Sequence, residues 1–350
     1  MTTRGATLAA LLSALGRPSW WILALAGFLV RGGIVVFVVA IVTVPSPLAL
    51  SNDLAPLLTP LYFGRLEPTT LALLVAAIVI IVAWIVAGGW FAAATEVVLV
   101  RDARQAAHEE GLPTRPLPPA GSMLITRSAV AHLVALIPMA FVLGVGSVQI
   151  FGVAYRELVN PSDAGPIVLR VVREASGPIA TIVVVWILGE LVGGMAVRRI
   201  VLGGESVLGA VVRSAVGLVR RPAGGLMSPL VTTAVLAIDL AAILTVVMLV
   251  WTEVRTRLAH PFAEPLATGL ALVTLGAAWC LALLVTGLID AWRSAAMTFE
   301  AERTAATAAA WPTAADEAGS QAGPPGGGTF GASAHRLPGD WSADDPGGSL

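Results

Sequence analysis

The sequence predicts an all-α protein: a polytopic transmembrane bundle of about six helices, with short interfacial amphipathic helices and a disordered C-terminal tail. Of the 350 residues, 57% are hydrophobic and only 12% are charged, whereas a soluble domain carries about 25% charged residues. Several apolar stretches reach the ~20 residues that a helix needs to cross ~30 Å of hydrocarbon. These stretches lack the alternating pattern of β-strands, so helices are expected to pair their backbone groups in lipid.

Three regions follow from the distribution of apolar residues. Residues 1–17 are expected to form an interfacial segment on the cytoplasmic membrane surface, with a short helix at 6–15. Residues 18–300 are expected to form the transmembrane domain, and Pro45 and Pro47 end its first span. The six spans are predicted at residues 20–44, 71–97, 130–154, 178–197, 229–251 and 266–288. Residues 301–350, rich in Ala, Gly and Pro towards their end, are expected to be a disordered cytoplasmic tail that binds a protein partner.

The arginines predict the orientation of the chain. All 21 basic residues are arginine. Apart from Arg31, fourteen lie in the termini and in the loops on the same side, and six lie in the remaining loops. The positive-inside rule then places both termini in the cytoplasm, and an even number of spans agrees with that. The expected location is the plasma membrane.

Arg31 interrupts the first apolar stretch. A single straight span over residues 20–44 would place this arginine near mid-membrane, at an insertion cost of at least ~2.5–3.5 kcal/mol. The alternative is an interfacial helix up to Val30, followed by a kinked span that starts at Gly32 and Gly33. The sequence leaves both placements open.

A central arginine needs an acidic partner. Glu190 and Asp239 fall near the middle of the fourth and fifth spans, and Glu96 falls near the cytoplasmic end of the second. Such a polar cluster either fixes the helices against one another or lines a path for an ion, a proton or a solute. The stretch from Gly189 to Gly193 is a small-xxx-small pattern, which lets two helices approach closely.

Arginines outside the spans are candidates for contacts with anionic lipid headgroups. The segment "GGESVLGAVVRSAVGLVRRPAG" has apolar residues at helical spacing and is expected to lie on the cytoplasmic membrane surface. The candidate headgroup contacts are Arg198, Arg199, Arg213, Arg220 and Arg221. Ordinary positive-inside arginines with no lipid preference are the alternative. The triplet Arg-Ser-Ala in this segment also occurs at 127–129 and 293–295, which suggests a repeated helix pair.

The same segment, with "LIDAWRSAAMTFEAER" near the end of the last span, resembles the membrane domain of glycerophosphodiester phosphodiesterases and related bacterial membrane proteins of unknown function. The resemblance covers about residues 180–300 and implies a shared helical architecture. In that family the hydrolase activity belongs to a separate soluble barrel domain, and no segment here corresponds to it. The resemblance therefore implies no catalytic residue.

Motifs for catalysis and cofactors are not found in the sequence. The four histidines are scattered without a His-Glu-x-x-His pattern, so neither a zinc site nor another metal site is expected. No Gly-x-Ser-x-Gly elbow occurs, and the glycines at 326–331 follow no strand, so no nucleotide cofactor is expected. The net charge of −1 and the lack of a basic aromatic stripe argue against a nucleic-acid partner.

Two classes of function remain. The first is a non-enzymatic membrane scaffold or a component that binds lipid or a protein partner. The second is a transporter of ions or small solutes, in which Arg31, Glu190 and Asp239 line the path.

Overall fold

The computed structural model describes residues 2–39, 41, 68–114, 116–119, 121–160, 162–163, 167–220, 227–258 and 265–309. Over this part of the chain, every regular element is a helix. Within these residues, six helical segments are long and apolar enough to cross a membrane. This number confirms the predicted fold class. Residues 310–350 of the predicted tail, the prolines at 45 and 47, and Arg221 lie outside the described residues.

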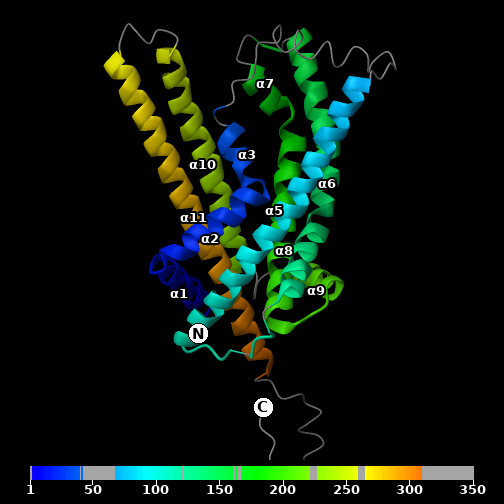
Figure 1. Cartoon of the computed structure of the whole chain (residues 1–350), viewed down its shortest axis with the longest axis vertical. Coiled ribbons are helices and arrows are strands. Elements are labelled where there is room, and N and C mark those ends of the chain that lie inside the picture. The colour runs from blue at the N-terminus through cyan, green and yellow to red at the C-terminus, as the bar shows by residue number, and fades with distance from the viewer. Residues whose placement is uncertain are drawn as a thin grey trace, which may run out of the picture. The chain divides into compact units, whose positions relative to one another are not determined.

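The first spanning segment is broken. Short helix α1 (Thr3–Leu15) precedes α2 (Pro18–Phe28), which begins with a proline in its first turn. A π-helical turn, η1 (Leu29–Gly33), then connects α2 to α3 (Ile34–Val39). Gly32 has φ +120°, a conformation that an L-residue with a side chain rarely adopts. The chain therefore changes direction beside Arg31, as Figure 1 shows, and this supports the kinked alternative for the first span.

The other five spanning segments are unbroken helices: α5 (Pro68–Glu109), α6 (Ser122–Val159), α8 (Ser176–Gly203), α10 (Met227–Leu258) and α11 (Pro265–Ala309). Pro138 lies inside α6 without ending it. Two short helices accompany them, α7 (Ile167–Glu174) and α9 (Val207–Arg220). Most of these helices extend well past the predicted spans. The predicted start of the tail at residue 301 falls inside α11, which continues as a helix to Ala309.

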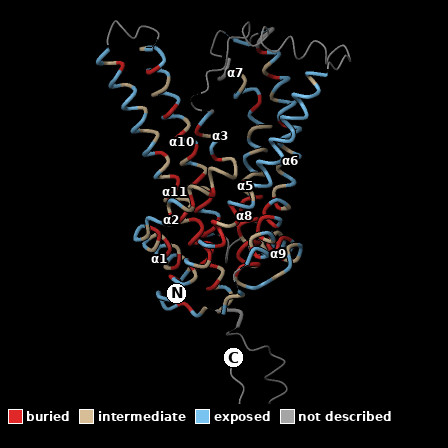
Figure 2. Tube along the Cα trace, viewed as in Figure 1, coloured by how far each residue is buried: buried red, intermediate tan, exposed pale blue. Residues whose placement is uncertain are grey.

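Burial is concentrated at one end of the bundle, which we call the base; it contains α1, α9 and the C-terminal parts of α5, α8 and α11 (Figure 2). One apolar cluster joins α1 and α2 to α5 and α11, and a second joins α5, α6, α8 and α9. By contrast, residues 71–86 of α5 are exposed on every side of the helix. The base is thus packed like a protein core, whereas the far halves of the spanning helices present apolar side chains to their surroundings.

Helix α1 uses small and large apolar residues on opposite faces. Its alanines at 6, 9, 10 and 14 are buried against α5 and α11. Leu8, Leu12 and Leu15 are exposed. A helix is therefore present where the interfacial segment was predicted. Its exposed leucine face is what a helix lying in the membrane surface needs.

Candidate functional site

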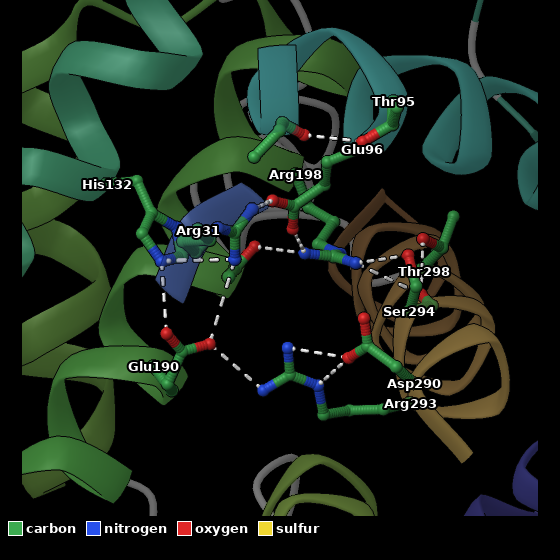
Figure 3. Close-up of polar contacts among 12 residues, drawn as sticks. Arg31, Thr95, Glu96, His132, Glu190, Arg198, Asp290, Arg293, Ser294 and Thr298 are labelled. Atoms are coloured by element: carbon green, nitrogen blue, oxygen red, sulfur yellow. Dashed lines mark hydrogen bonds and ion pairs between the residues drawn. The ribbon is translucent and has the colours of Figure 1, made fainter. Parts of the chain in front are cut away.

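Arg31 lies at the break in the first spanning segment, and its guanidinium points into the bundle (Figure 3). Its Nη2 donates to Oε2 of Glu96 on α5 at 2.6 Å, and its Nη1 lies 3.8 Å from Oε2 of Glu190 on α8. Two of the three carboxylates expected as partners are therefore beside it. Because Gly32 turns the backbone directly after Arg31, this side chain enters the bundle between α5 and α8.

Glu96 binds a second arginine. Its Oε1 accepts a 2.7 Å hydrogen bond from Nη1 of Arg198 on α8. Arg198 also donates to the carbonyl of Gly194 and, through Nη2, to Oγ of Ser294 on α11 at 2.7 Å. Only 3% of Arg198 is exposed. Glu96 and Arg198 thus connect α5, α8 and α11 in one chain of charge-assisted contacts, which are the stronger class of hydrogen bond.

Glu190 completes the cluster from the other side. Its Oε2 accepts from Nη1 of Arg293 on α11 at 3.1 Å. Arg293 in turn pairs with Asp290, three residues earlier on the same helix, at 2.8 Å. The charge cluster, as we call it below, consists of Arg31, Glu96, His132, Glu190, Arg198, Asp290 and Arg293. Its members come from η1, α5, α6, α8 and α11, so it is shared by five elements that are distant in sequence.

His132 on α6 lies between a hydrogen-bond donor, the guanidinium of Arg31, and an acceptor, the carboxylate of Glu190. Its Nε2 is 3.2 Å from Nη1 of Arg31, which can only donate, and 3.3 Å from Oε1 of Glu190. A neutral ring satisfies one of them at a time, since Nε2 either accepts or donates. Nδ1 of the ring is buried without a hydrogen-bond partner. It faces Gly193, where an added Cβ would lie 2.9 Å from Nδ1.

The small-xxx-small pattern of α8 is what allows α6 so close. A Cβ at Gly193 would meet the His132 ring, and one at Gly189 would lie 3.0 Å from Leu136 and 3.3 Å from the carbonyl oxygen of Ala135. The two glycines therefore bring α6 against α8, as expected of such patterns. This contact holds His132 at the distance from Glu190 that a hydrogen bond requires.

The charge cluster is balanced in charge and leaves little free space between its side chains. Three guanidinium groups pair with three carboxylates, and His132 adds no charge when neutral. The cavity that these side chains enclose has a volume of about 20 Å³. That is room for about one water molecule, and it is too small for a hydrated ion or a solute.

The depth of the cluster follows from the apolar runs that lead to it. Residues 71–94 of α5 and 266–289 of α11 carry no charge, and each run is about 36 Å long as a helix. Each therefore spans the ~30 Å of hydrocarbon on its own, and Glu96 and Asp290 follow directly. Residues 133–155 of α6, which follow His132, form a third such run. We infer that the cluster lies near the hydrocarbon boundary at the base, not at mid-membrane.

Asp239 does not join the cluster. Its carboxylate accepts a 3.1 Å hydrogen bond from Oγ1 of Thr286 on α11, and it does not line the small cavity. The expectation that Asp239 shares a site with Arg31 is therefore wrong for this fold. Its partner Thr286 lies one helical turn before Asp290 on α11, so Asp239 meets α11 on the side of Asp290 that leads away from the base.

The predicted headgroup arginines divide into two groups. The prediction for Arg198 is wrong, because this residue is buried and bound to Glu96 and is therefore not available to a lipid headgroup. Arg199 is 41% exposed, and Arg213 is 66% exposed; both lie beside Glu205 at 3.5 and 3.3 Å. Arg220 is exposed at the end of α9. These three remain candidates.

Sequence reasoning missed four contributors to this region: His132, Asp290, Arg293 and Ser294. Two signals pointed to the last three, and none pointed to His132. Asp290 and Arg293 directly follow the last apolar run, at the depth of Glu96. Arg293 and Ser294 also begin the third Arg-Ser-Ala triplet. The serine of each of the three triplets (Ser128, Ser214 and Ser294) is buried. Among the described residues, no group of His, Cys, Asp and Glu side chains is arranged to hold a metal ion.

The six apolar helices and the base that joins them define a multi-pass α-helical membrane protein. No protein-family model matches the chain, and neither the curated proteins nor the solved structures contain a significantly similar one.

Proposed function

We propose that this protein is a non-enzymatic membrane scaffold, in which the charge cluster locks the spanning helices into one arrangement. The observation that carries the proposal is the tight, balanced geometry of the cluster: three arginines pair with three carboxylates around a cavity of only about 20 Å³. A transport path needs a wider, water-filled cavity around its charged side chains. A cluster that only fixes the helices needs close ion pairs and no such cavity.

The contacts of the cluster explain how it would lock the bundle. Buried ion pairs contribute little net stability compared with apolar packing, but they penalise any arrangement that leaves one charge unpaired. Glu96 pairs with arginines on two other elements, and so does Glu190. A shift of α5 or α8 by one turn would therefore separate at least two pairs at once.

The orientation that we propose for the scaffold in the membrane rests on the distribution of its arginines. We place the protein in the plasma membrane with both termini in the cytoplasm, so that the arginine-rich base faces the cytoplasmic leaflet. The resemblance to the membrane domain of glycerophosphodiester phosphodiesterases supports a shared helical architecture without catalysis. With this orientation, a protein partner of the C-terminal tail would be a cytoplasmic one.

A transporter is the second candidate, and one observation favours it. A cleft of about 360 Å³ between α8, α10 and α11 borders the cluster, and Arg198 and Met297 line both spaces. Arg31 of the cluster lies on η1, which interrupts the first spanning helix, and transport sites are often built from broken helices. Rotation of Arg198 away from Glu96 would open the cleft towards the cluster.

Cysteine accessibility separates the two candidates. The test is Ser294→Cys in a Cys280→Ala background, reconstituted in vesicles and treated with a small membrane-impermeant thiol reagent. Glu110→Cys, at an exposed position just after α5, is the water-accessible control, and Val79→Cys is the lipid-facing control. A scaffold predicts that the thiol introduced at position 294 reacts only after denaturation. Labelling at position 294 at a rate close to that at position 110 would show a water-filled site and would favour the transporter.

A further inference from the structure

Helix α9 has one buried face and one exposed apolar face. Ala210, Val211 and Ser214 are buried, and the helix packs against α6 and α8. On the opposite side, an exposed ridge runs along the helix; its members, the α9 ridge below, are Leu208, Val212, Val216 and Val219, with exposed fractions of 69, 50, 40 and 79%. A helix that faced water on this side would have no reason to present four aliphatic side chains in one line.

The level of α9 matches the headgroup region of a membrane. The helix packs on α6 and on residues 196–201 of α8. It belongs to the same apolar cluster as Val97 and Val100 of α5, which lie within about one turn of Glu96. Since Glu96 ends the apolar run of α5, α9 lies just outside the hydrocarbon boundary. Interfacial helices bury their apolar face about 5–10 Å into this zone. Helix α1, with its exposed leucines, packs on Leu99 and Ala103 of α5 at a similar level.

The charges along α9 are all positive. Arg213 and Arg220 are exposed, and the helix contains no acidic residue between Val207 and Arg220. Glu205, before the helix, is shared by Arg213 and Arg199 and so offsets only one of these positive charges. An aliphatic ridge next to exposed arginines complements a lipid surface whose headgroups carry a net negative charge.

We propose that α9 is an interfacial anchor: its ridge inserts into one leaflet, and Arg213 and Arg220 bind the phosphates of anionic phospholipids. This inference extends the scaffold role by naming a lipid partner, and it rests on the proposed function for the depth of the base. Failure of the α9 anchor can be told apart from failure of the scaffold proposal, because substitutions on α9 leave the charge cluster intact. A protein partner on the α9 ridge is the alternative that the test must exclude.

The insertion test uses a nitroxide at Val219→Cys in the Cys280→Ala background. The protein is reconstituted in vesicles of phosphatidylcholine, with or without phosphatidylglycerol, and the collision rates of the nitroxide with oxygen and with a water-soluble nickel complex are compared. Positions 79 and 110 give the lipid and water references. We expect high oxygen and low nickel access at position 219. High nickel access in both kinds of vesicle would overturn the proposal and leave the α9 ridge for a protein partner.

The headgroup test uses Arg213→Gln/Arg220→Gln. We expect the preference for phosphatidylglycerol over phosphatidylcholine, measured as retained lipid by native mass spectrometry, to fall about fivefold for each arginine removed. The matched control is Arg255→Gln, which removes an exposed arginine near the C-terminal end of α10. We expect this control to leave the lipid preference unchanged. An unchanged preference in the α9 double variant, or an equal loss in the control, would overturn the assignment of the headgroups to α9.

Discussion

Arg31 and Glu96, 65 residues apart in the sequence, are joined by a 2.6 Å ion pair where the broken first span meets α5. The pair is not isolated, because Arg198 binds the second oxygen of the same carboxylate. Arg31 therefore need not be an unpaired charge at mid-membrane. It belongs to a balanced cluster just where the apolar runs of α5 and α11 end.

Gly193→Ala should loosen the contact between α6 and α8. The new Cβ would lie 2.9 Å from Nδ1 of His132, whose ring is held by its contacts with Arg31 and Glu190. Overpacking of this kind costs about 1–3 kcal/mol, and the thermal midpoint in detergent should fall. The matched control is Gly144→Ala on α6, where a Cβ meets no atom within 4 Å. Equal midpoints for the two variants would contradict this close approach.

Gly32→Ala should disturb the break before α3 without any steric clash. No atom lies within 4 Å of the Cβ position, but φ is +120°, so the substitution forces a strained backbone that costs on the order of 1–3 kcal/mol. Gly89→Ala, in open space within α5, should be neutral or slightly stabilising. The check is the yield of monodisperse protein together with the thermal midpoint. A Gly32 variant as stable as the Gly89 variant would argue against the turn at this residue.

His132→Leu and Glu190→Gln should differ in severity. The histidine substitution removes a single partner from Glu190, which keeps Arg293 and Arg31, so we expect a loss of about 1–3 kcal/mol. Glu190→Gln instead removes the carboxylate that Arg31 and Arg293 share, so three buried guanidinium groups are left with two carboxylates, Glu96 and Asp290. Leaving a buried charge uncompensated in this way costs about 3–5 kcal/mol. Denaturant titration in mixed micelles measures both losses. The opposite ranking would mean that His132, and not the carboxylate, organises this side of the cluster.

The fold class and the six spans could be predicted because hydropathy reports directly on what a helix must bury in lipid. The helix ends could not. The prediction ended the second span at Val97, whereas α5 continues to Glu109, because alanine-rich residues 103–107 favour a helix outside the membrane as well. Hydropathy marks where the membrane ends and contains no signal for where the helix ends.

The depth of Glu96 could be predicted, but Glu190 was expected near mid-membrane and instead belongs to the cluster at the end of the apolar runs. The direction in which the site residues point could not be predicted either. Arg198 and Arg199 are neighbours in sequence, yet successive residues on a helix point about 100° apart. Arg198 therefore faces Glu96, while Arg199 faces the surface beside Glu205. For the same reason Glu190 joined Arg31 and Asp239 did not. The rotation of each helix about its axis depends on packing at glycines such as Gly189 and Gly193, which only the structure displays.

The most direct test of the charge cluster as a structural lock compares Glu96→Gln with Glu96→Gln/Arg198→Gln. The single substitution leaves Arg31 and Arg198 facing a neutral amide, and we predict a loss of about 3–5 kcal/mol, seen as a lower thermal midpoint and yield. The double substitution removes one charge of each sign, leaving two arginines with two carboxylates, and we predict that most of the loss is recovered. A double variant no more stable than the single one, or a single variant as stable as the unsubstituted protein, would contradict the lock.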